Sequence, residues 1–176
     1  RPFPKAQPPH SCDAGLWGKP TVLNNAETWA TVPKIIKNGA DWYAGMGNEN
    51  AQGCKVWAIS GNIKYNGLME LDMKTTFQEA IDDYCGGIQK KKPLKVVHVG
   101  GVTGGFLPPE KANTPTDYES LLEAGVLMGQ ASFAAYDDSA CVIDLAKFSI
   151  GFNEGETCGK CTPCRIGLTL IRAKLD

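Results

Sequence analysis

The sequence predicts an α+β protein, in which a small mixed module comes before the start of an α-helical bundle. Runs rich in β-forming residues lie at 54–60, 68–73 and 94–101, a helical run lies at 75–87, and amphipathic helical patterns follow residue 139. The order strand, strand, helix, strand within about 50 residues is typical of a β-grasp, ubiquitin-like module. Such modules include soluble-ligand-binding domains, so a binding or docking role is also open.

Each element has a local signal. The segments CKVWAIS and LKVVHVGG are rich in β-branched and aromatic residues, whereas TTFQEAIDDYCGG begins with a threonine cap and stops at Gly-Gly. The glycine- and proline-rich segment 100–115 indicates a long loop. A short helix is expected at 117–125 and a short strand at 132–137.

Helical patterns also flank the module. One helix is expected to begin near Ala26, after an asparagine cap, and to stop before Gly39. A second is expected over 140–150 with its end at Gly151, and a third opens after the cysteine-rich loop. The predicted organisation is a strap and linker at 1–50, the β-grasp module at 51–110, a connector at 111–138 and the start of the helical bundle at 139–176.

Composition excludes two classes of partner. The 176 residues are 43% hydrophobic and 21% charged, with a net charge of −1. This balance lacks the basic footprint that nucleic acid requires. The uninterrupted apolar runs are far shorter than the roughly 20 residues that cross a bilayer, so we expect no direct membrane insertion.

Seven cysteines carry the chemical signal. Cys158, Cys161 and Cys164 form a Cys-x-x-Cys-x-x-Cys pattern, which indicates a metal site in a reducing compartment rather than a disulfide framework. Amide groups at a helix N-terminus favour thiolate charge, and this suits an iron–sulfur cluster. The scattered cysteines are expected to be small buried hydrophobes; they are Cys12, Cys54, Cys85 and Cys141.

The fourth ligand is not evident from the residues. Bacterial ferredoxins place a fourth cysteine shortly after the triplet, but none follows Cys164 here. A zinc site would need a distant partner, and both histidines, His10 and His98, are expected to be structural. Cys141 could supply a thiolate, although core packing is the favoured expectation. A cluster, a zinc ion and an unligated reactive thiol set therefore all remain open.

Three stretches together resemble one family. GLWGKPTVLNNAETWATVP, DYESLLEAGVLMG and GETCGKCTPCRIG are similar, in this order, to the 51 kDa flavoprotein subunit of NADH dehydrogenases (respiratory complex I). The hydrogenase-type relatives, which reduce NAD(P) or bifurcate electrons, look closer than the respiratory form. The similarity extends over essentially the whole chain, and Ile166 departs from it because respiratory members often carry Glu there.

The resemblance implies a set of cofactors and sites. The family oxidises NAD(P)H through FMN, which passes single electrons to a [4Fe-4S] cluster and onward to iron–sulfur partner subunits. Cys158, Cys161 and Cys164 match three of the four cluster ligands, and Asn24 and Asn25 match the asparagine pair at the flavin pocket. No catalytic acid or base is expected, because hydride transfer is the chemistry of the cofactor.

The same resemblance implies that part of the family pattern lies outside these residues. The glycine-rich flavin and nucleotide loops have no counterpart here, and the fourth ligand is expected downstream. We therefore expect a fragment: 1–50 would end the FMN-binding domain, and 139–176 would begin the cluster-binding bundle. The chain alone should bind little FMN and oxidise no NADH. The expected location is cytoplasmic, with a peripheral place on a membrane complex left open. The alternative is a non-enzymatic docking module with a structural metal.

Overall fold

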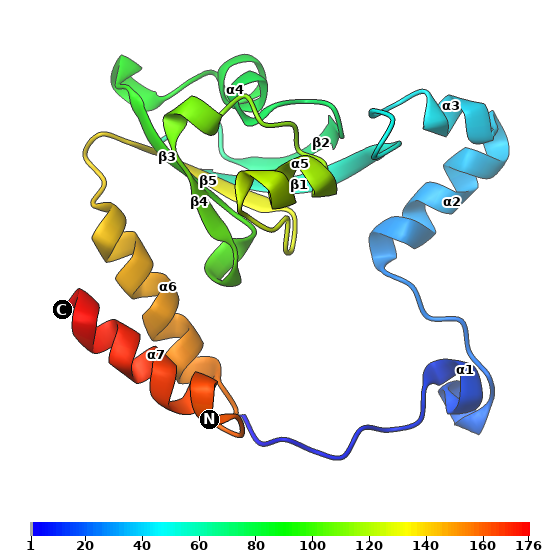
Figure 1. Cartoon of the computed structure of the whole chain (residues 1–176). Helices are drawn as coiled ribbons and strands as arrows, with labels where there is room; N and C mark the ends of the chain where they lie inside the picture. The colour runs from blue at the N-terminus through cyan, green and yellow to red at the C-terminus, as the bar shows by residue number, and fades with distance from the viewer. Residues whose placement is uncertain (1) are drawn as a thin grey trace.

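A five-stranded sheet forms the centre of the chain, with a helical pair after it and a helical N-terminal segment before it (Figure 1). The computed structural model describes residues 2–176. The strands are β1 (Cys54–Gly61), β2 (Gly67–Asp72), β3 (Leu94–Val99), β4 (Gly105–Leu107) and β5 (Ser132–Asp137).

The order of strands across the sheet is β2-β1-β5-β3-β4. β1 and β5 run parallel, whereas β1–β2, β3–β4 and β3–β5 are antiparallel. This topology is that of the predicted β-grasp, and the mixed α+β class is confirmed. The central strand β5 comes from the segment that sequence reasoning treated as a connector, 111–138, so the sheet is completed only at Asp137.

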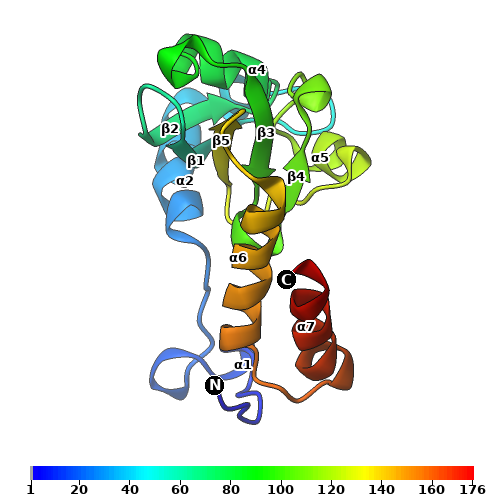
Figure 2. The same cartoon turned by 90° about the vertical axis from the view of Figure 1, so that its left-hand side faces the viewer.

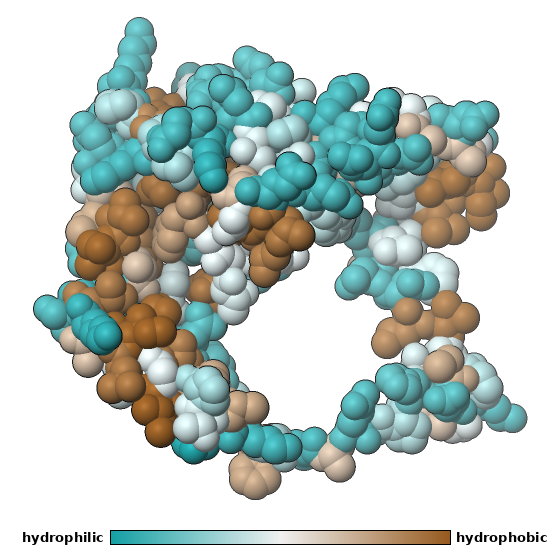
Figure 3. Space-filling view, in the orientation of Figure 1, coloured by the Kyte–Doolittle hydropathy of each residue, from teal (hydrophilic) through white to brown (hydrophobic). Residues whose placement is uncertain are grey.

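Seven α-helices lie before, between and after the strands within residues 2–176. The longest, α6 and α7, lie side by side below the sheet (Figures 1 and 2). Helix α2 lies across an opening from them, which the space-filling view shows (Figure 3). The bounds are α1 (Ser11–Ala14), α2 (Ala26–Asn38), α3 (Ala40–Ala44), α4 (Phe77–Glu79), α5 (Tyr118–Ala124), α6 (Val142–Glu156) and α7 (Thr162–Leu175).

Two predictions about element bounds are wrong. The segment 100–115 is not all loop, because Gly105–Leu107 pairs with Val97–Val99 as strand β4. A strand of three residues has too little intrinsic propensity to be recognised without its partner. The helix expected to end at Gly151 continues to Glu156. Its last turn is held by α7, where Arg172 pairs with Glu154 at 2.9 Å.

Three aromatic rings occupy the core between the sheet and α4. Trp57 and Phe77 are fully buried, and Phe133 is nearly so. Phe77 meets the other two rings edge-on, with centroid distances of 5.7 Å to Trp57 and 5.2 Å to Phe133. Edge-to-face contacts of this kind contribute stability beyond that from the burial of apolar area. Thr76 caps α4 through a capping box with Glu79, which fixes how Phe77 enters the core.

The N-terminal segment is tied to the sheet by polar contacts. Glu27 on α2 forms an ion pair with Lys55 and accepts a hydrogen bond from the Val56 amide at 2.7 Å. Burial would raise the pKa of Glu27, but the bonds from Lys55 and Val56 outweigh it and the pKa is lowered. Asn48 donates to Asp117 at 2.7 Å and so joins the segment to α5.

Asp117 is a buried N-cap whose removal should destabilise the fold. Its carboxylate accepts hydrogen bonds from the Ser120 amide, the Ser120 hydroxyl and Asn48. Asp117→Ala should lower the free energy of unfolding by about 1–3 kcal/mol, because three donors lose their acceptor. Urea denaturation of the variant and wild type measures this difference, and equal stabilities would contradict it.

The same carboxylate predicts an acid dependence. Burial alone would raise the pKa of Asp117, but the bonds from Ser120 and Asn48 lower it below its ordinary value. Its stabilising contribution is therefore present above the unfolded-state pKa of about 4 and is lost as pH falls through the lower folded-state pKa. The stability difference between wild type and Asp117→Ala should accordingly shrink in unfolding experiments below about pH 4.

Candidate metal centre

The cysteine triplet lies on the loop between α6 and α7. Cys158 follows the end of α6, Cys161 is the N-cap residue of α7, and Cys164 lies in the first turn of α7. All three are exposed free thiols. Pro163 occupies the first turn of α7, where a missing amide proton costs no helical hydrogen bond. The pattern thus presents three thiols to solvent within seven residues of chain.

Side chains within the loop hold its backbone. The guanidinium of Arg165 donates to the Gly159 carbonyl at 2.8 Å, to the Lys160 carbonyl at 3.1 Å and to the Thr162 hydroxyl at 3.2 Å. Gly159 has a φ of 72°, a left-handed conformation that glycine adopts without steric cost. Arg165 therefore fastens the segment between Cys158 and Cys161 to the start of α7.

Hydrogen bonds and ion pairs join the two helices that carry the loop. Glu154 on α6 accepts hydrogen bonds from the Thr169 hydroxyl at 2.7 Å and from Arg172 at 2.9 Å, both on α7. Lys147 and Asp176 form a second ion pair at 3.2 Å. These contacts keep α6 and α7 antiparallel, as Figure 2 shows, so the cysteine loop projects from the end of the pair away from the sheet.

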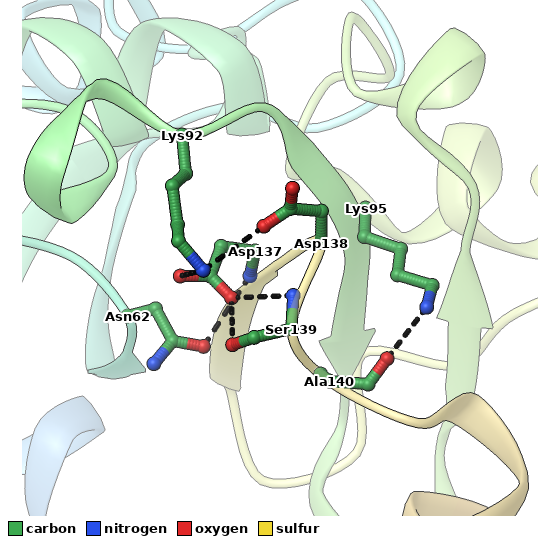
Figure 4. A network of polar contacts seen from close by, with 7 residues as sticks. All are labelled: Asn62, Lys92, Lys95, Asp137, Asp138, Ser139 and Ala140. Carbon is green, nitrogen blue, oxygen red and sulfur yellow. Dashed lines mark hydrogen bonds and ion pairs between the residues drawn. The ribbon is translucent and has the colours of Figure 1, made fainter.

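A polar turn sets the direction in which the chain leaves the sheet for α6 (Figure 4). The Asp137 carboxylate accepts from the Ser139 amide at 2.9 Å and from the Ser139 hydroxyl, and it lies 3.5 Å from the Lys92 ammonium. The bonds from Ser139, with the charge of Lys92, lower the pKa of Asp137. Lys95 donates to the Ala140 carbonyl at 2.6 Å, one residue before the N-cap of α6.

α6 is also fixed to the sheet module further along. The Asn153 amide donates to the Val102 carbonyl at 2.9 Å and to the Ser149 carbonyl at 2.8 Å. Val102 lies in the turn between β3 and β4. The last turn of α6, and with it the cysteine loop, is therefore placed by the β-grasp module rather than by α7 alone.

The residues present fit an iron–sulfur group in donor chemistry but do not form a complete site. Three exposed thiols supply the soft ligands that such clusters require. Within residues 2–176, no three His, Cys, Asp or Glu side chains are gathered closely enough to hold a metal ion. The loop is thus a three-ligand segment that would have to close around a metal with help from a further group.

The remaining cysteines do not all behave as expected. Cys85 is buried as predicted, but Cys12 and Cys141 are exposed, and the prediction of core packing for them is wrong. Cys141 is the N-cap residue of α6 and lies at the surface there. Cys54 is half-buried and donates to Glu70 at 2.9 Å. Burial and this neighbouring carboxylate raise the pKa of Cys54 to about 12, which disfavours its thiolate as a ligand.

The predicted flavin contacts, Asn24 and Asn25, are both exposed. Asn25 occupies the N-cap position of α2 as predicted, but its side chain makes no cap hydrogen bond. A cavity of about 960 Å³ lies between α2–α3 and β1–β2, with Trp42, Tyr43 and Val56 among its walls. Neither Asn24 nor Asn25 is among the residues that line this cavity. The cavity and the two predicted flavin contacts are therefore separate features of the structure.

His98 is half-buried and stacks on Phe106 with ring centroids 4.3 Å apart, and burial lowers its pKa although a bond with Gly101 opposes this. Thr157, which sequence reasoning missed, lies 2.8 Å from the Cys164 sulfur. The only signal in the sequence was a hydroxyl residue directly before the first cysteine.

Comparisons with known proteins give the class of protein first. Residues 144–176 match the model of the NADH-ubiquinone oxidoreductase-F iron-sulfur binding region. Together with the β-grasp fold, this match gives the class: a mixed α+β segment whose last part is similar to the iron–sulfur-binding region of NADH-ubiquinone oxidoreductase F subunits. The helices within residues 2–176 include none that is long and apolar enough to cross a bilayer.

Curated relatives match almost the whole of this chain. The chain is 42% identical to the NADP-reducing hydrogenase component HndC of Solidesulfovibrio fructosivorans, covering 98% of this chain and 35% of that protein. It is 39% identical to an F-type NADH-quinone oxidoreductase subunit of Rhizobium meliloti (strain 1021), covering 96% of this chain and 40% of that protein. Over the part that it spans, the chain is similar to F-type NADH-quinone oxidoreductase subunits and to their hydrogenase relatives.

A solved structure agrees with this assignment. A chain of the NAD+-reducing [NiFe]-hydrogenase in the H2-reduced state superposes with a TM-score of 0.78 at 29% identity. The match covers 98% of this chain and 28% of that chain. The resemblance found in the sequence is therefore confirmed at the level of family and fold, although the present residues span only a minor part of their relatives' length. Identities of 42% and 39% do not separate the hydrogenase from the respiratory branch.

Proposed function

We propose that this chain is the β-grasp and cluster-binding segment of an NAD(P)H-oxidising flavin/iron–sulfur oxidoreductase subunit. The observation that carries the proposal is the set of three exposed thiols on the α6–α7 loop, within a region that matches an iron–sulfur-binding family model. Cys158, Cys161 and Cys164 would supply three ligands, and a group outside residues 2–176 would supply the fourth. Iron–sulfur subunits of a multi-subunit complex would be its partners.

The proposed division of labour follows from what each part of the chain offers. When bound, a [4Fe-4S] cluster supplies one-electron transfer, and FMN links this to the two-electron chemistry of NAD(P)H. The chain's own contribution is to hold the thiols at the end of the α6–α7 pair. The contacts of Asn153 with Val102 and of Lys95 with Ala140 would keep that pair at a constant place relative to the sheet module.

The N-terminal segment would join this unit to the flavin site. Asn24 and Asn25 precede α2 and are exposed, so their amides are free to face another part of the protein. An amide side chain both donates and accepts hydrogen bonds, which suits the ribityl and phosphate groups of FMN. In this proposal, Glu27 would hold α2 against β1 through Lys55 and Val56, and so place both asparagines.

Anaerobic reconstitution of the full-length protein tests the proposal. We expect a brown protein with bound iron and sulfide, broad absorption near about 400 nm and an EPR signal on reduction. A colourless protein that binds one zinc ion per chain would instead support a docking module with a structural metal. Apart from the metal, loss of NAD(P)H oxidation on removal of FMN would support the flavin part of the proposal.

A further inference from the structure

The hydroxyl of Thr157 contacts two residues of the cysteine loop, Gly159 and Cys164. Its Oγ1 accepts a hydrogen bond from the Gly159 amide at 3.3 Å and lies 2.8 Å from the Cys164 sulfur. Thr157 thus bridges the two ends of the loop, since Gly159 follows the first cysteine and Cys164 is the third. Arg165 fastens the other side of the same loop through the Gly159 and Lys160 carbonyls.

The direction of the Thr157–Cys164 bond follows from chemistry. A cysteine that ligates a metal does so as a thiolate, which carries no proton and can only accept hydrogen bonds. The Gly159 amide already donates to one lone pair of the Thr157 oxygen. The hydroxyl proton is therefore the group that faces the sulfur whenever Cys164 acts as a ligand.

The end of α6 fixes the position of the Thr157 backbone. Its backbone amide donates to the Asn153 carbonyl at 2.9 Å, which makes it the C-cap residue of that helix. Asn153 is itself bonded to Val102 in the sheet module. A continuous set of contacts therefore runs from the β3–β4 turn through Asn153 to the hydroxyl beside Cys164.

We propose that Thr157 is a positioning residue of the cysteine site, whose hydroxyl orients the Cys164 sulfur and raises the reduction potential of the bound group. The inference rests on the proposed function, because it assigns an electronic role at that same site. Hydrogen bonds to the sulfur ligands of an iron–sulfur cluster stabilise its more negatively charged reduced state, and they are one of the factors that set its potential. Removal of the hydroxyl should therefore shift the potential downward.

Two substitutions, one that keeps the shape of the side chain and one that keeps its hydroxyl, test the role. Thr157→Val keeps the branched side chain but replaces the hydroxyl with a methyl group, whereas Thr157→Ser keeps the hydroxyl. In the reconstituted full-length protein, an EPR-monitored reductive titration should give a lower potential for Thr157→Val and a potential close to wild type for Thr157→Ser. Lys174→Ala, at the far end of α7, is the control for a surface change on the same helix.

A second readout does not depend on the metal. In the metal-free full-length protein, the Gly159 amide should exchange with solvent about fivefold faster in Thr157→Val than in wild type, as expected for loss of one hydrogen bond of typical strength. Thr157→Ser should exchange at nearly the wild-type rate. Faster exchange of the Gly159 amide in Thr157→Val, but not in Thr157→Ser, supports the positioning role. If Thr157→Val instead weakened α7 as a whole, amides distant from the loop would also exchange faster, and this result would contradict the role.

The outcomes separate this inference from the proposed function. A wild-type protein that binds no iron–sulfur group contradicts the proposed function, and the inference falls with it. A wild-type protein with a normal cluster, together with an unchanged potential in Thr157→Val, overturns the inference alone. A lowered potential in Thr157→Val that is restored in Thr157→Ser supports both.

Discussion

Substitution of Cys161 by serine in the full-length protein is expected to lower its iron content after reconstitution by more than about tenfold. Cys161 is the central thiol of the triplet and the N-cap residue of α7, so its loss would remove the proposed ligand at the start of that helix. Substitution of a residue that only hydrogen-bonds to a metal ligand already lowers metal affinity by about 10- to 100-fold, and loss of a ligand itself should lower it further. Iron and sulfide analysis, with the visible spectrum, measures the effect.

Cys141 and Cys12 provide matched controls for this prediction. Both are exposed free thiols in the same chain, but neither belongs to the triplet. Cys141→Ser and Cys12→Ser should keep the iron content near that of wild type. A loss of iron in Cys141→Ser as large as in Cys161→Ser would identify Cys141 as the fourth ligand, and it would contradict the proposal that this ligand lies outside residues 2–176.

Replacement of Phe77 by alanine should destabilise the chain by about 3–5 kcal/mol, the range for loss of a fully buried aromatic ring. Phe77 is completely buried and contacts both Trp57 and Phe133 edge-on, so its removal leaves a cavity between α4 and the sheet. Because typical domains are stable by only about 5–15 kcal/mol, this loss is a large fraction of the total. Urea denaturation followed by circular dichroism gives the difference.

An exposed phenylalanine serves as the control for Phe77. Phe148 on α6 is 67% exposed, and Phe148→Ala should change the stability by less than about 0.5 kcal/mol. Figure 3 shows apolar side chains gathered over α6 and α7, the two helices on which Phe148, Phe152 and Leu170 are exposed. Equal losses in Phe77→Ala and Phe148→Ala would contradict the view that the stability of this chain resides in the β-grasp core.

The sequence was sufficient for elements whose signals are local. The strand at Cys54–Gly61 and the helix Ala26–Asn38 were recognised from β-branched content, an N-cap asparagine and a closing glycine. The cysteine triplet was equally clear, because its chemistry depends on residue type and spacing alone. The family resemblance, which rests on stretches of such local patterns, agrees with relatives of 39–42% identity.

Other features needed contacts between distant residues. Strand β4 exists because Gly105–Leu107 pairs with β3, and α6 extends past Gly151 because Arg172 on α7 pairs with Glu154. The central place of β5 likewise follows from pairing with β1, which lies far earlier in the chain. Assignments of element bounds from propensity alone are weakest where such long-range partners decide the outcome.

What the sequence by itself determined is therefore the α+β class, the elements with strong local signals and the three thiols of the candidate metal centre. What only the tertiary structure decided is how those thiols are presented. Exposure of Cys141, the hold of Arg165 on the loop and the 2.8 Å approach of Thr157 to Cys164 depend on how side chains meet after folding. The physical reason is that spacing along the chain selects ligand types, whereas hydrogen bonds and burial between packed elements set their geometry.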